Sequence, residues 1–299
     1  MMADPRMMTQ ISSKPGFLAA LDQSGGSTPG ALRTYGIPDN AYSGDEEMFR
    51  LVHEMRVRIM TSPAFTGDKI IGAILFEKTM DGEAAGRPVP AYLWQDKGVV
   101  PFLKIDKGLQ PEADGVSMMK PMPDLDALLA RAVKFGVFGT KERSTIHLGS
   151  KTGIAAIAAQ QFEVGRLVLR HGLSPILEPE VLIKSPNKAE AEAILRDELL
   201  RALDALRGDD KVMIKLTIPE APDLYKPVID HPRTLRIVAL SGGYELHDGC
   251  RRLSRNQGMI ASFSRALVGD LRLQMSDAEF NAALAKTVDE IYRASTIKV

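Results

Sequence analysis

The sequence predicts an α/β protein that folds as a single (β/α)8 TIM barrel over residues 1–299. Short runs rich in Val, Ile, Leu and Phe alternate with longer segments of helical period, as expected for repeated βα units around a parallel sheet. We count eight such runs, and eight parallel strands close a barrel. The sequence has no low-complexity tract, fixed-period repeat or Pro- or Ser-rich linker, so nothing in it marks a second domain.

The expected strands are the short apolar runs. They cover residues 17–21, 70–76, 99–105, 144–148, 175–177, 212–218, 236–240 and 259–263. Residues 77–98, after the second run, contain Gly, Pro and Trp94, and we expect an extended loop that carries a short helix.

The expected helices repeat apolar residues with a period near 3.6. They cover residues 46–60, 152–171, 188–207 and a last segment that follows residue 276. Gly172 and Gly208 end the second and third, because glycine is the residue that most often follows a helix. The last helix begins with a capping box, in which Ser276 precedes Glu279 by three residues.

Composition excludes several classes of function. The 38 Lys and Arg residues balance 38 Asp and Glu residues, so there is no bulk charge to hold nucleic acid or an anionic membrane. No segment resembles a signal peptide or a membrane span, and we expect a cytoplasmic protein. Its only cysteine, Cys250, excludes intramolecular disulfides, and the five scattered histidines lack the paired spacing of a metal site. We therefore expect neither a metal nor a cofactor.

Lys215 is the first candidate for chemistry. It lies in segment 212–219, which has no other charged residue, with Ile214 and Leu216 on its two sides. An amine in apolar surroundings is expensive to charge, so Lys215 is a candidate nucleophile. On this segment alone, a lysine that snorkels to solvent at a strand end is the plainer interpretation. The other strand ends favour the nucleophile.

Ionisable residues collect where the expected strands end, and in a parallel barrel the active site is built from the carboxyl ends of several strands. They are Asp22 after the first strand, Lys104 on the third, Lys141 and Arg143 at the start of the fourth unit, Glu178 and Glu180 after the fifth, and Lys215 on the sixth. Glu178 and Glu180 alternate by two, so both point to the same side of an extended strand and can share acid and base work. Taken alone, the pair is equally consistent with two solvated carboxylates.

Two further segments are candidate phosphate sites. Ser241, Gly242 and Gly243 follow the seventh strand, and Ser264 and Arg265 follow the eighth, which is the usual place of a phosphate site in a barrel. Residues 22–27 are not a P-loop, because no Gly-Lys-Ser/Thr follows, but Ser24 and Ser27 can still hold a second phosphate.

In these segments the chain resembles the class I fructose-bisphosphate aldolases, specifically the shorter bacterial type. The matching motifs are LAALDQSGGS (residues 18–27), VVPFLKIDKG (99–108), PILEPE (175–180), VMIKLTIP (212–219), LSGG (240–243) and ASFSRAL (261–267). Six ordered motifs spread over nearly the whole length make coincidence implausible.

The resemblance implies a function and assigns roles by position. The family's Schiff-base lysine matches Lys215, and its proton acceptor and dehydration acid matches Glu178. Its further catalytic residues match Asp22, Lys141 and Glu180. Its contacts to the sugar phosphate match Ser24, Ser27, Lys104, Arg143, Ser241, Gly242, Gly243, Ser264 and Arg265. The implied reaction is the reversible cleavage of fructose 1,6-bisphosphate in glycolysis and gluconeogenesis, with small-molecule sugar phosphates as partners. A homo-oligomer is compatible with the sequence.

One departure from the longer animal enzymes leaves a role open. Those enzymes end in a mobile tail whose tyrosine assists proton transfer, whereas this chain ends just after a helix, at residues 297–299. Glu178 and the bound phosphate are the candidates for exchanging the proton of the enamine carbon.

Two alternatives remain on sequence grounds. Another Schiff-base aldolase or a transaldolase would act on a different sugar phosphate, and transaldolases carry their lysine on strand four, which would point to Lys141. A non-catalytic barrel that binds sugar phosphates or proteins is the other alternative, and the complete set of Lys215, Glu178 and Asp22 disfavours it.

Overall fold

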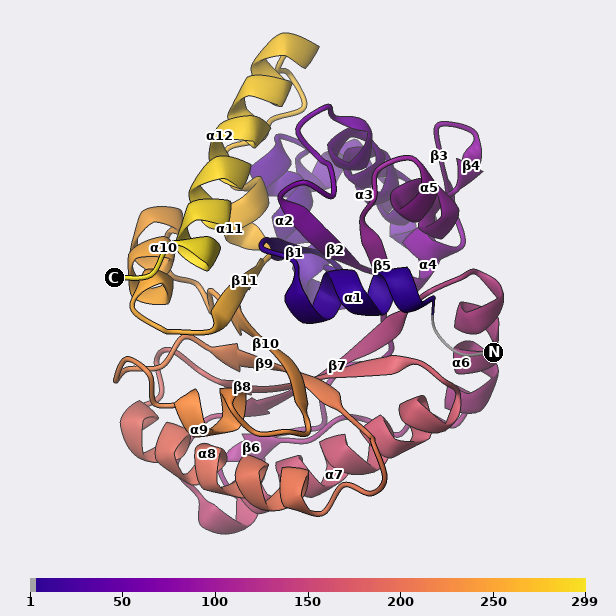
Figure 1. Cartoon of the computed structure of the whole chain (residues 1–299). Helices are drawn as coiled ribbons and strands as arrows, with labels where there is room; N and C mark the ends of the chain where they lie inside the picture. Colours follow the sequence, from indigo (N-terminus) through magenta and orange to yellow (C-terminus); the bar gives the residue numbers. More distant parts are fainter. Residues whose placement is uncertain (1–3) are drawn as a thin grey trace.

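The computed structural model describes residues 4–299, apart from the side chain of Ser27. Eight parallel strands form a closed barrel, because the last strand pairs with the first. In order around the barrel they are β1 (Phe17–Leu21), β2 (Ile70–Leu75), β5 (Val100–Lys104), β7 (Gly139–Ile146), β8 (Ser174–Val181), β9 (Val212–Thr217), β10 (Thr234–Leu240) and β11 (Met259–Phe263). The predicted (β/α)8 TIM barrel is confirmed (Figure 1).

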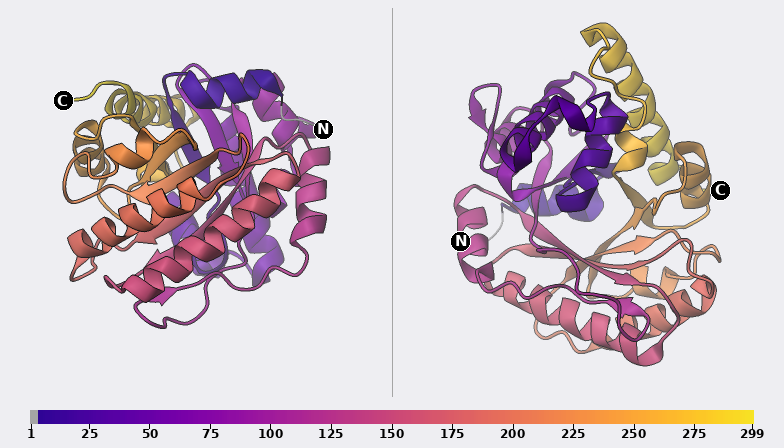
Figure 2. Two further views of the ribbon diagram at one scale, coloured as in Figure 1. Left: turned by 60° about the horizontal axis from the view of Figure 1, so that its bottom comes forward. Right: turned by 180° about the vertical axis from the view of Figure 1, so that it is seen from behind.

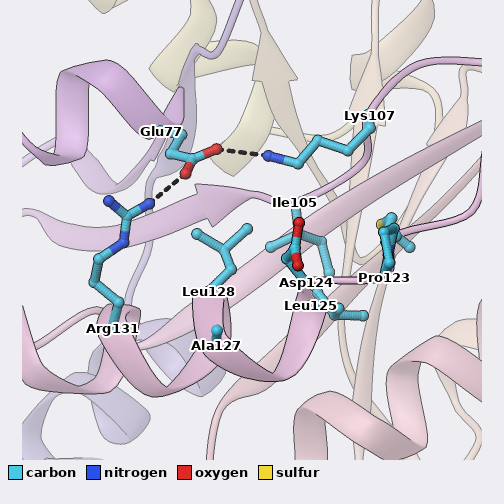
Figure 3. A pocket seen from close by; sticks show the side chains of 10 residues that line it. Glu77, Ile105, Lys107, Pro123, Asp124, Leu125, Ala127, Leu128 and Arg131 are labelled. Carbon is cyan, nitrogen blue, oxygen red and sulfur yellow. Dashed lines mark hydrogen bonds and ion pairs between the residues drawn. The ribbon is translucent and has the colours of Figure 1, made fainter.

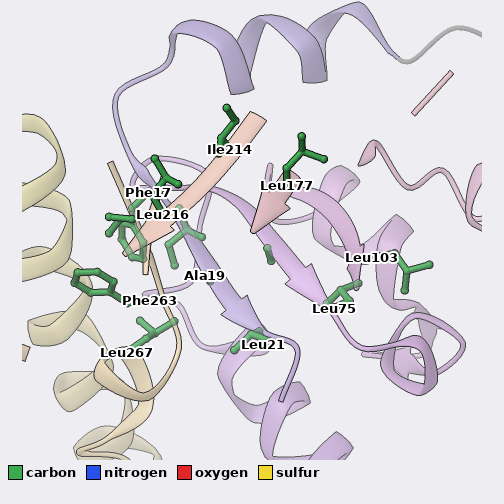
Figure 4. Packing of buried hydrophobic residues seen from close by; sticks show 14 of the residues in the cluster. Phe17, Ala19, Leu21, Leu75, Leu103, Leu177, Ile214, Leu216, Phe263 and Leu267 are labelled. Atoms are coloured by element: carbon green, nitrogen blue, oxygen red, sulfur yellow. The ribbon is translucent and has the colours of Figure 1, made fainter. Parts of the chain in front are cut away.

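Helices surround the barrel (Figures 1 and 2). They are α2 (Thr28–Tyr35), α3 (Gly44–Thr61), α4 (Glu77–Met80), α5 (Val89–Gln95), α6 (Leu125–Lys134), α7 (Lys151–Arg170), α8 (Lys188–Asp204), α9 (Lys226–Ile229), α10 (Leu246–Ser254), α11 (Arg265–Val268) and α12 (Asp277–Thr296), with the 3₁₀ turns η1 (Gly25–Ser27) and η2 (Asp39–Ala41). The capping box predicted at Ser276 is present at the start of α12. Buried apolar residues between strands and helices form the main core, and Figure 4 shows members of it from β1, β9, β11 and α11.

The segment after β2 holds more structure than the sequence predicts. In place of a loop with one short helix, it forms α4, a hairpin of β3 (Glu83–Ala84) and β4 (Arg87–Pro88), and α5. A further short strand, β6 (Val116–Ser117), pairs antiparallel with β7.

A helix that the sequence analysis did not identify closes the amino-terminal end of the barrel. Helix α1 (Pro5–Ser13) lies across the barrel end that faces the viewer in Figure 1. Met7 and Ile11 enter the apolar cluster inside the barrel, and the Gln10 side chain donates to the backbone carbonyls of Ile71 and Gly98. These contacts seal one end, so the open end is the carboxyl end of the strands.

A change from apolar to charged residues along the strands positions the site. Side chains that face the interior recur every second residue. Ala20, Phe102, Ile176 and Met213 belong to the inner apolar cluster. Two residues further along the same strands come Asp22, Lys104, Glu178 and Lys215. The barrel therefore has an apolar floor with a ring of ionisable groups directly above it.

Two strand predictions are wrong in their boundaries. The fourth strand was expected at residues 144–148, but β7 begins at Gly139, so Lys141 and Arg143 lie within the strand. The fifth was expected at residues 175–177, but β8 extends to Val181 and includes Glu178 and Glu180. The apolar run starts late in β7 and stops early in β8, because both strands carry charged residues that pair with one another inside the barrel mouth.

Candidate active site

Four ionisable residues from four strands contact one another at the carboxyl end of the barrel. Lys141 Nζ on β7 lies 2.7 Å from Asp22 Oδ2, just after β1, and 2.8 Å from Glu178 Oε2 on β8. Lys215 Nζ on β9 lies 3.1 Å from Glu178 Oε1. All four side chains are buried. Asp22, Lys141, Glu178 and Lys215 thus form one continuous network, which we call the ionised centre.

The two lysines fix the charge of the carboxylates in the ionised centre. Burial alone would raise the pKa of Asp22 and of Glu178, but the charges of Lys141 and Lys215 outweigh it and lower both values. Burial would likewise lower the pKa of Lys141, but Asp22 and Glu178 raise it well above its ordinary value. Lys141 is therefore a permanent cation, whereas Lys215 contacts a single carboxylate of the centre.

The backbone ladder between β8 and β9 ends at the level of the ionised centre. The paired residues are Ile176 with Met213 and Leu177 with Ile214, so pairing stops just before Glu178 and Lys215. Beyond that point the hydroxyl of Thr217 donates to the carbonyl of Val181 across 2.6 Å. The two reactive side chains lie where the strands separate, and a side-chain hydrogen bond holds the spacing there.

The remaining predicted ionisable residues form two pairs beside the ionised centre. Arg143 Nε lies 2.5 Å from Glu180 Oε2, and Lys104 Nζ lies 2.7 Å from Asp106 Oδ1. Arg143 is directly opposite Glu178 in the β7–β8 ladder. The structure therefore brings Lys104, Arg143 and Glu180 to the same barrel mouth as Lys215.

The predicted phosphate segment after β10 comes close to Arg265. Gly242 and Gly243 both have positive φ values, 61° and 113°. A β-carbon on Gly243 would lie 3.4 Å from a terminal guanidinium nitrogen of Arg265. Ser241 is buried at the end of β10, and Ser264 is the N-cap of α11. Glycine is favoured at both positions because the backbone there has positive φ.

The second predicted phosphate segment, residues 22–27, lies beside the first. Gln23 Nε2 donates to Ser264 Oγ across 2.6 Å, which joins the loop after β1 to the end of β11. Ser24 follows Gln23 in this loop, and Ser27 closes η1, although its side chain lies outside the described part of the chain.

One cavity in the described residues is lined by none of the four residues of the ionised centre. It has a volume of about 510 Å³ and lies between α4 and α6. Figure 3 shows Glu77 joined to Lys107 and Arg131 above Ile105, Leu125 and Leu128. None of the predicted site residues lines it, so the chemistry of the barrel mouth does not extend into this cavity.

The described histidines and Cys250 do not form part of the ionised centre. No group of three or more His, Cys, Asp and Glu side chains within residues 4–299 has the geometry of a metal site. Four of the histidines lie beside four different carboxylates, on Glu112, Asp126, Asp204 and Glu290. Burial raises the pKa of Cys250 to about 12, so its thiol is protonated at neutral pH.

One buried cation was missed by the sequence analysis. Arg56 on α3 is fully buried and donates to Thr79 Oγ1 and to the carbonyl of Gln23. The sequence contained an indication of this residue, because Arg56 lies on the same face of the predicted helix as the apolar residues Val52, Met55 and Ile59. An arginine on an apolar stripe is unusual and marks a position of interest.

Comparison with known proteins identifies relatives over almost the whole chain. Residues 13–221 match the family model described as fructose-bisphosphate aldolase class-I. A "fructose-bisphosphate aldolase class 1" of Synechocystis sp. is 56% identical over 288 residues, which are 96% of this chain and 96% of that protein. A protein of the same description from Porphyromonas gingivalis is 54% identical over 288 residues, 96% of this chain and 98% of that one.

A solved structure supports the fold. Fructose-bisphosphate aldolase of Plasmodium falciparum, crystallised with TRAP and a small-molecule inhibitor, superposes with a TM-score of 0.76. The superposition covers 100% of this chain and 98% of the other, at 19% sequence identity. At that identity the likeness shows a common barrel.

Proposed function

Because the chain belongs to the class I fructose-bisphosphate aldolase family, we propose that Lys215 is the amine that forms the Schiff base with the ketose. The protein is a carbon–carbon lyase of glycolysis that reversibly cleaves fructose 1,6-bisphosphate to dihydroxyacetone phosphate and glyceraldehyde 3-phosphate. The observation that carries our assignment is the unequal pairing of the two central lysines. Lys141 is held between two carboxylates, and Lys215 contacts one.

Formation of the Schiff base uses the contact between Lys215 and Glu178. Lys215 Nζ first passes a proton across 3.1 Å to Glu178 Oε1 and then attacks C2 of the open-chain ketose. A second proton moves from the nitrogen to the C2 oxygen and gives the C2 hydroxyl. Glu178 starts as a carboxylate and can accept the first proton, because Lys141 and Lys215 outweigh the effect of burial and lower its pKa. Glu178 then returns the proton to the C2 hydroxyl, which leaves as water. The iminium that remains is an electron sink.

Cleavage follows from the iminium. Asp22 or Glu178 removes the proton of the C4 hydroxyl, the C3–C4 bond breaks, and C4 leaves as the aldehyde carbon of glyceraldehyde 3-phosphate. The bond's electron pair moves to the iminium and gives an enamine. Protonation of C3 and hydrolysis then release dihydroxyacetone phosphate and restore Lys215. Lys141, fixed as a cation, stabilises the negative charge that develops on the C4 oxygen.

The phosphates of the substrate are assigned by their distance from C2. The C1 phosphate is one carbon from the Schiff base, and β10 is the neighbour of β9. Ser241, Gly242, Gly243, Ser264 and Arg265 therefore hold the C1 phosphate. The C6 phosphate lies four carbons from C2 and reaches the loop that contains Ser24 and Ser27. Lys104 and Arg143 are the basic residues near the sugar phosphates, and Glu180, which pairs with Arg143, is a further catalytic residue.

We also propose that residues 1–299 act as one catalytic unit in the cytoplasm, where the sugar phosphates of glycolysis are found. Association into a homo-oligomer is part of the same proposal. Within residues 4–299, no helix has the length and apolarity needed to cross a membrane.

Borohydride trapping tests the central assignment. The protein is incubated with dihydroxyacetone phosphate, reduced with borohydride and digested, and the mass of each lysine peptide is measured. We expect the adduct on the Lys215 peptide, with the Lys141 peptide of the same digest as the internal control. An adduct on Lys141, as expected for a transaldolase with its lysine on the fourth strand, would disprove the assignment. An adduct that persists in Lys215→Met would also disprove it.

A further inference from the structure

Arg56 is a charged residue that the reaction described above does not use. Its side chain extends from α3 and is fully buried. One terminal nitrogen donates to Thr79 Oγ1 across 2.8 Å, and the other donates to the backbone carbonyl of Gln23. Its Nε has no hydrogen-bond partner in the described part of the chain. Within residues 4–299, no carboxylate forms an ion pair with Arg56.

Such a guanidinium is costly to bury. Burial lowers the pKa of Arg56 to about 10, and the nearby Asp22 opposes only part of this effect. The group is still a cation at neutral pH. An unpaired buried cation destabilises a fold, so a protein keeps one only where it has a role. The position of Arg56 beneath the loop after β1 indicates what requires it.

Arg56 fixes the orientation of this loop through its backbone. The Gln23 carbonyl is directed to the guanidinium, and in a planar trans peptide the following N–H, that of Ser24, points the opposite way. The Gln23 side chain in turn donates to Ser264 Oγ. Arg56 therefore acts directly on the C6-phosphate loop and reaches Ser264 only indirectly, through the Gln23 side chain.

The C6-phosphate loop has no cation of its own. Residues 22–32 contain neither lysine nor arginine. The next basic residue, Arg33, is exposed and pairs with Asp39. A phosphate dianion bound there is stabilised by positive charge, and Arg56 adds positive charge from the buried side of the loop. The dianion in turn offsets the unpaired charge of the guanidinium.

We propose that Arg56 is a positioning residue that selects bisphosphate substrates, because it orients and charges the loop that receives the C6 phosphate. This inference rests on the proposed function, in which the C1 phosphate binds at β10 and β11. A ketose 1-monophosphate has no C6 phosphate, so it depends on Arg56 less than a bisphosphate does. The specificity for fructose 1,6-bisphosphate over fructose 1-phosphate is therefore the property that Arg56 controls.

The test compares the two substrates in matched variants. The ratio of kcat/KM for fructose 1,6-bisphosphate to that for fructose 1-phosphate is measured in the wild type, Arg56→Met and Arg56→Lys. We expect the ratio to fall roughly tenfold or more in Arg56→Met, because kcat/KM for fructose 1,6-bisphosphate falls. The ratio should fall by a smaller factor in Arg56→Lys, because lysine keeps the charge but lacks the two terminal nitrogens of the planar guanidinium.

Arg58 supplies the control. It lies on the same helix and also donates to backbone carbonyls, those of Leu273 and Met275, but these lead into α12 and not to the phosphate loop. Arg58→Met is expected to lower stability and leave the ratio unchanged. Equal loss of activity on both substrates in Arg56→Met would show a merely structural role and overturn the proposal. If Arg56→Met is insoluble, an unchanged ratio in Arg56→Lys overturns it.

Borohydride trapping separates this proposal from the proposed function. Dihydroxyacetone phosphate has only the phosphate next to the carbonyl, so the Arg56 variants are expected to trap it on Lys215 as the wild type does. Failure of trapping in the wild type would refute the role of Lys215. Normal trapping with an unchanged substrate ratio would refute only the role of Arg56.

Discussion

Replacing Lys141 by methionine removes a cation that contacts both carboxylates of the ionised centre and keeps a side chain of similar length. The oxygens of Asp22 and Glu178 lie 2.7 and 2.8 Å from its Nζ, so they are at most about 5.5 Å apart. Without the lysine, two carboxylates at that distance repel by about 3 kcal/mol at an effective dielectric of about 20. This energy corresponds to a rise of about 2 units in the apparent pKa at which the pair of carboxyls loses its second proton.

At a mildly acidic pH, the carboxyl pair of the variant should therefore retain a proton that the wild-type pair has already lost. Burial raises the pKa of Asp22 and of Glu178, and in the wild type the two lysines outweigh it. In Lys141→Met both carboxylates lose their shared cation, so one carboxyl of the pair stays protonated to higher pH. We expect the acid limb of the pH–rate profile to move up by about 2 units. We also expect kcat/KM for fructose 1,6-bisphosphate at neutral pH to fall roughly 100-fold or more, because a charge that stabilises the transition state is lost.

Steady-state cleavage measured from about pH 5 to about pH 9 tests this expectation. Lys151→Met is the matched control, because Lys151 is an exposed lysine at the start of α7 and contacts none of these groups. Lys141→Met is also expected to form the borohydride adduct on Lys215 after long incubation. A folded Lys141→Met with the wild-type pH profile, or one that traps no substrate, would refute the role given to Lys141.

Three further predictions concern acid stability, thiol reactivity and a helix cap. The lysine charges outweigh burial and lower the pKa of Asp22 in the folded protein, so ionised Asp22 stabilises the fold above its unfolded-state pKa of about 4. This stabilisation is lost as the pH falls further. The melting temperature of Asp22→Asn, measured by calorimetry, should therefore depend less steeply on pH below about 4 than that of the wild type. Burial raises the pKa of Cys250 to about 12, so at pH ~8 its alkylation should be on the order of 1000-fold slower than in the denatured protein, and equal rates would contradict the burial. Ser276→Ala removes the hydroxyl that accepts from the Glu279 amide, and guanidinium unfolding should show a loss of about 1 kcal/mol, whereas no loss would mean that the cap is not needed.

The barrel could be predicted because the apolar runs and the alternation of strands with helices both indicate a parallel barrel. Strands β1 and β11 were predicted with their observed bounds, since both are uninterrupted apolar runs. Strand β7 was displaced because Lys141 and Arg143 interrupt its apolar pattern. Lys141 and Arg143 are stabilised inside the strand by carboxylates from other segments, and the periodicity of the sequence does not contain that information.

The candidate site was predictable as a set of residues but not as a set of contacts. Polar residues at strand ends were readable from the sequence, and the structure brings Asp22, Lys141, Glu178 and Lys215 into contact. That Lys141 pairs with two carboxylates and Lys215 with one depends on the position of each strand around the closed barrel. Helix α1 was missed because it is short, and only its fit into the barrel end shows its role.

The two-residue interval between the apolar floor and the ionised centre makes the reaction sensitive to strand register. A slip of one residue in β9 would replace Lys215 inside the barrel by Ile214 or Leu216 and would turn the ammonium into the helix layer. The same slip in β8 would exchange Glu178 for Leu177 or Pro179. An insertion or deletion within either strand therefore abolishes chemistry and destabilises the core at once, so variants that keep the fold but lose the reaction should arise by substitution and not by changes in strand length.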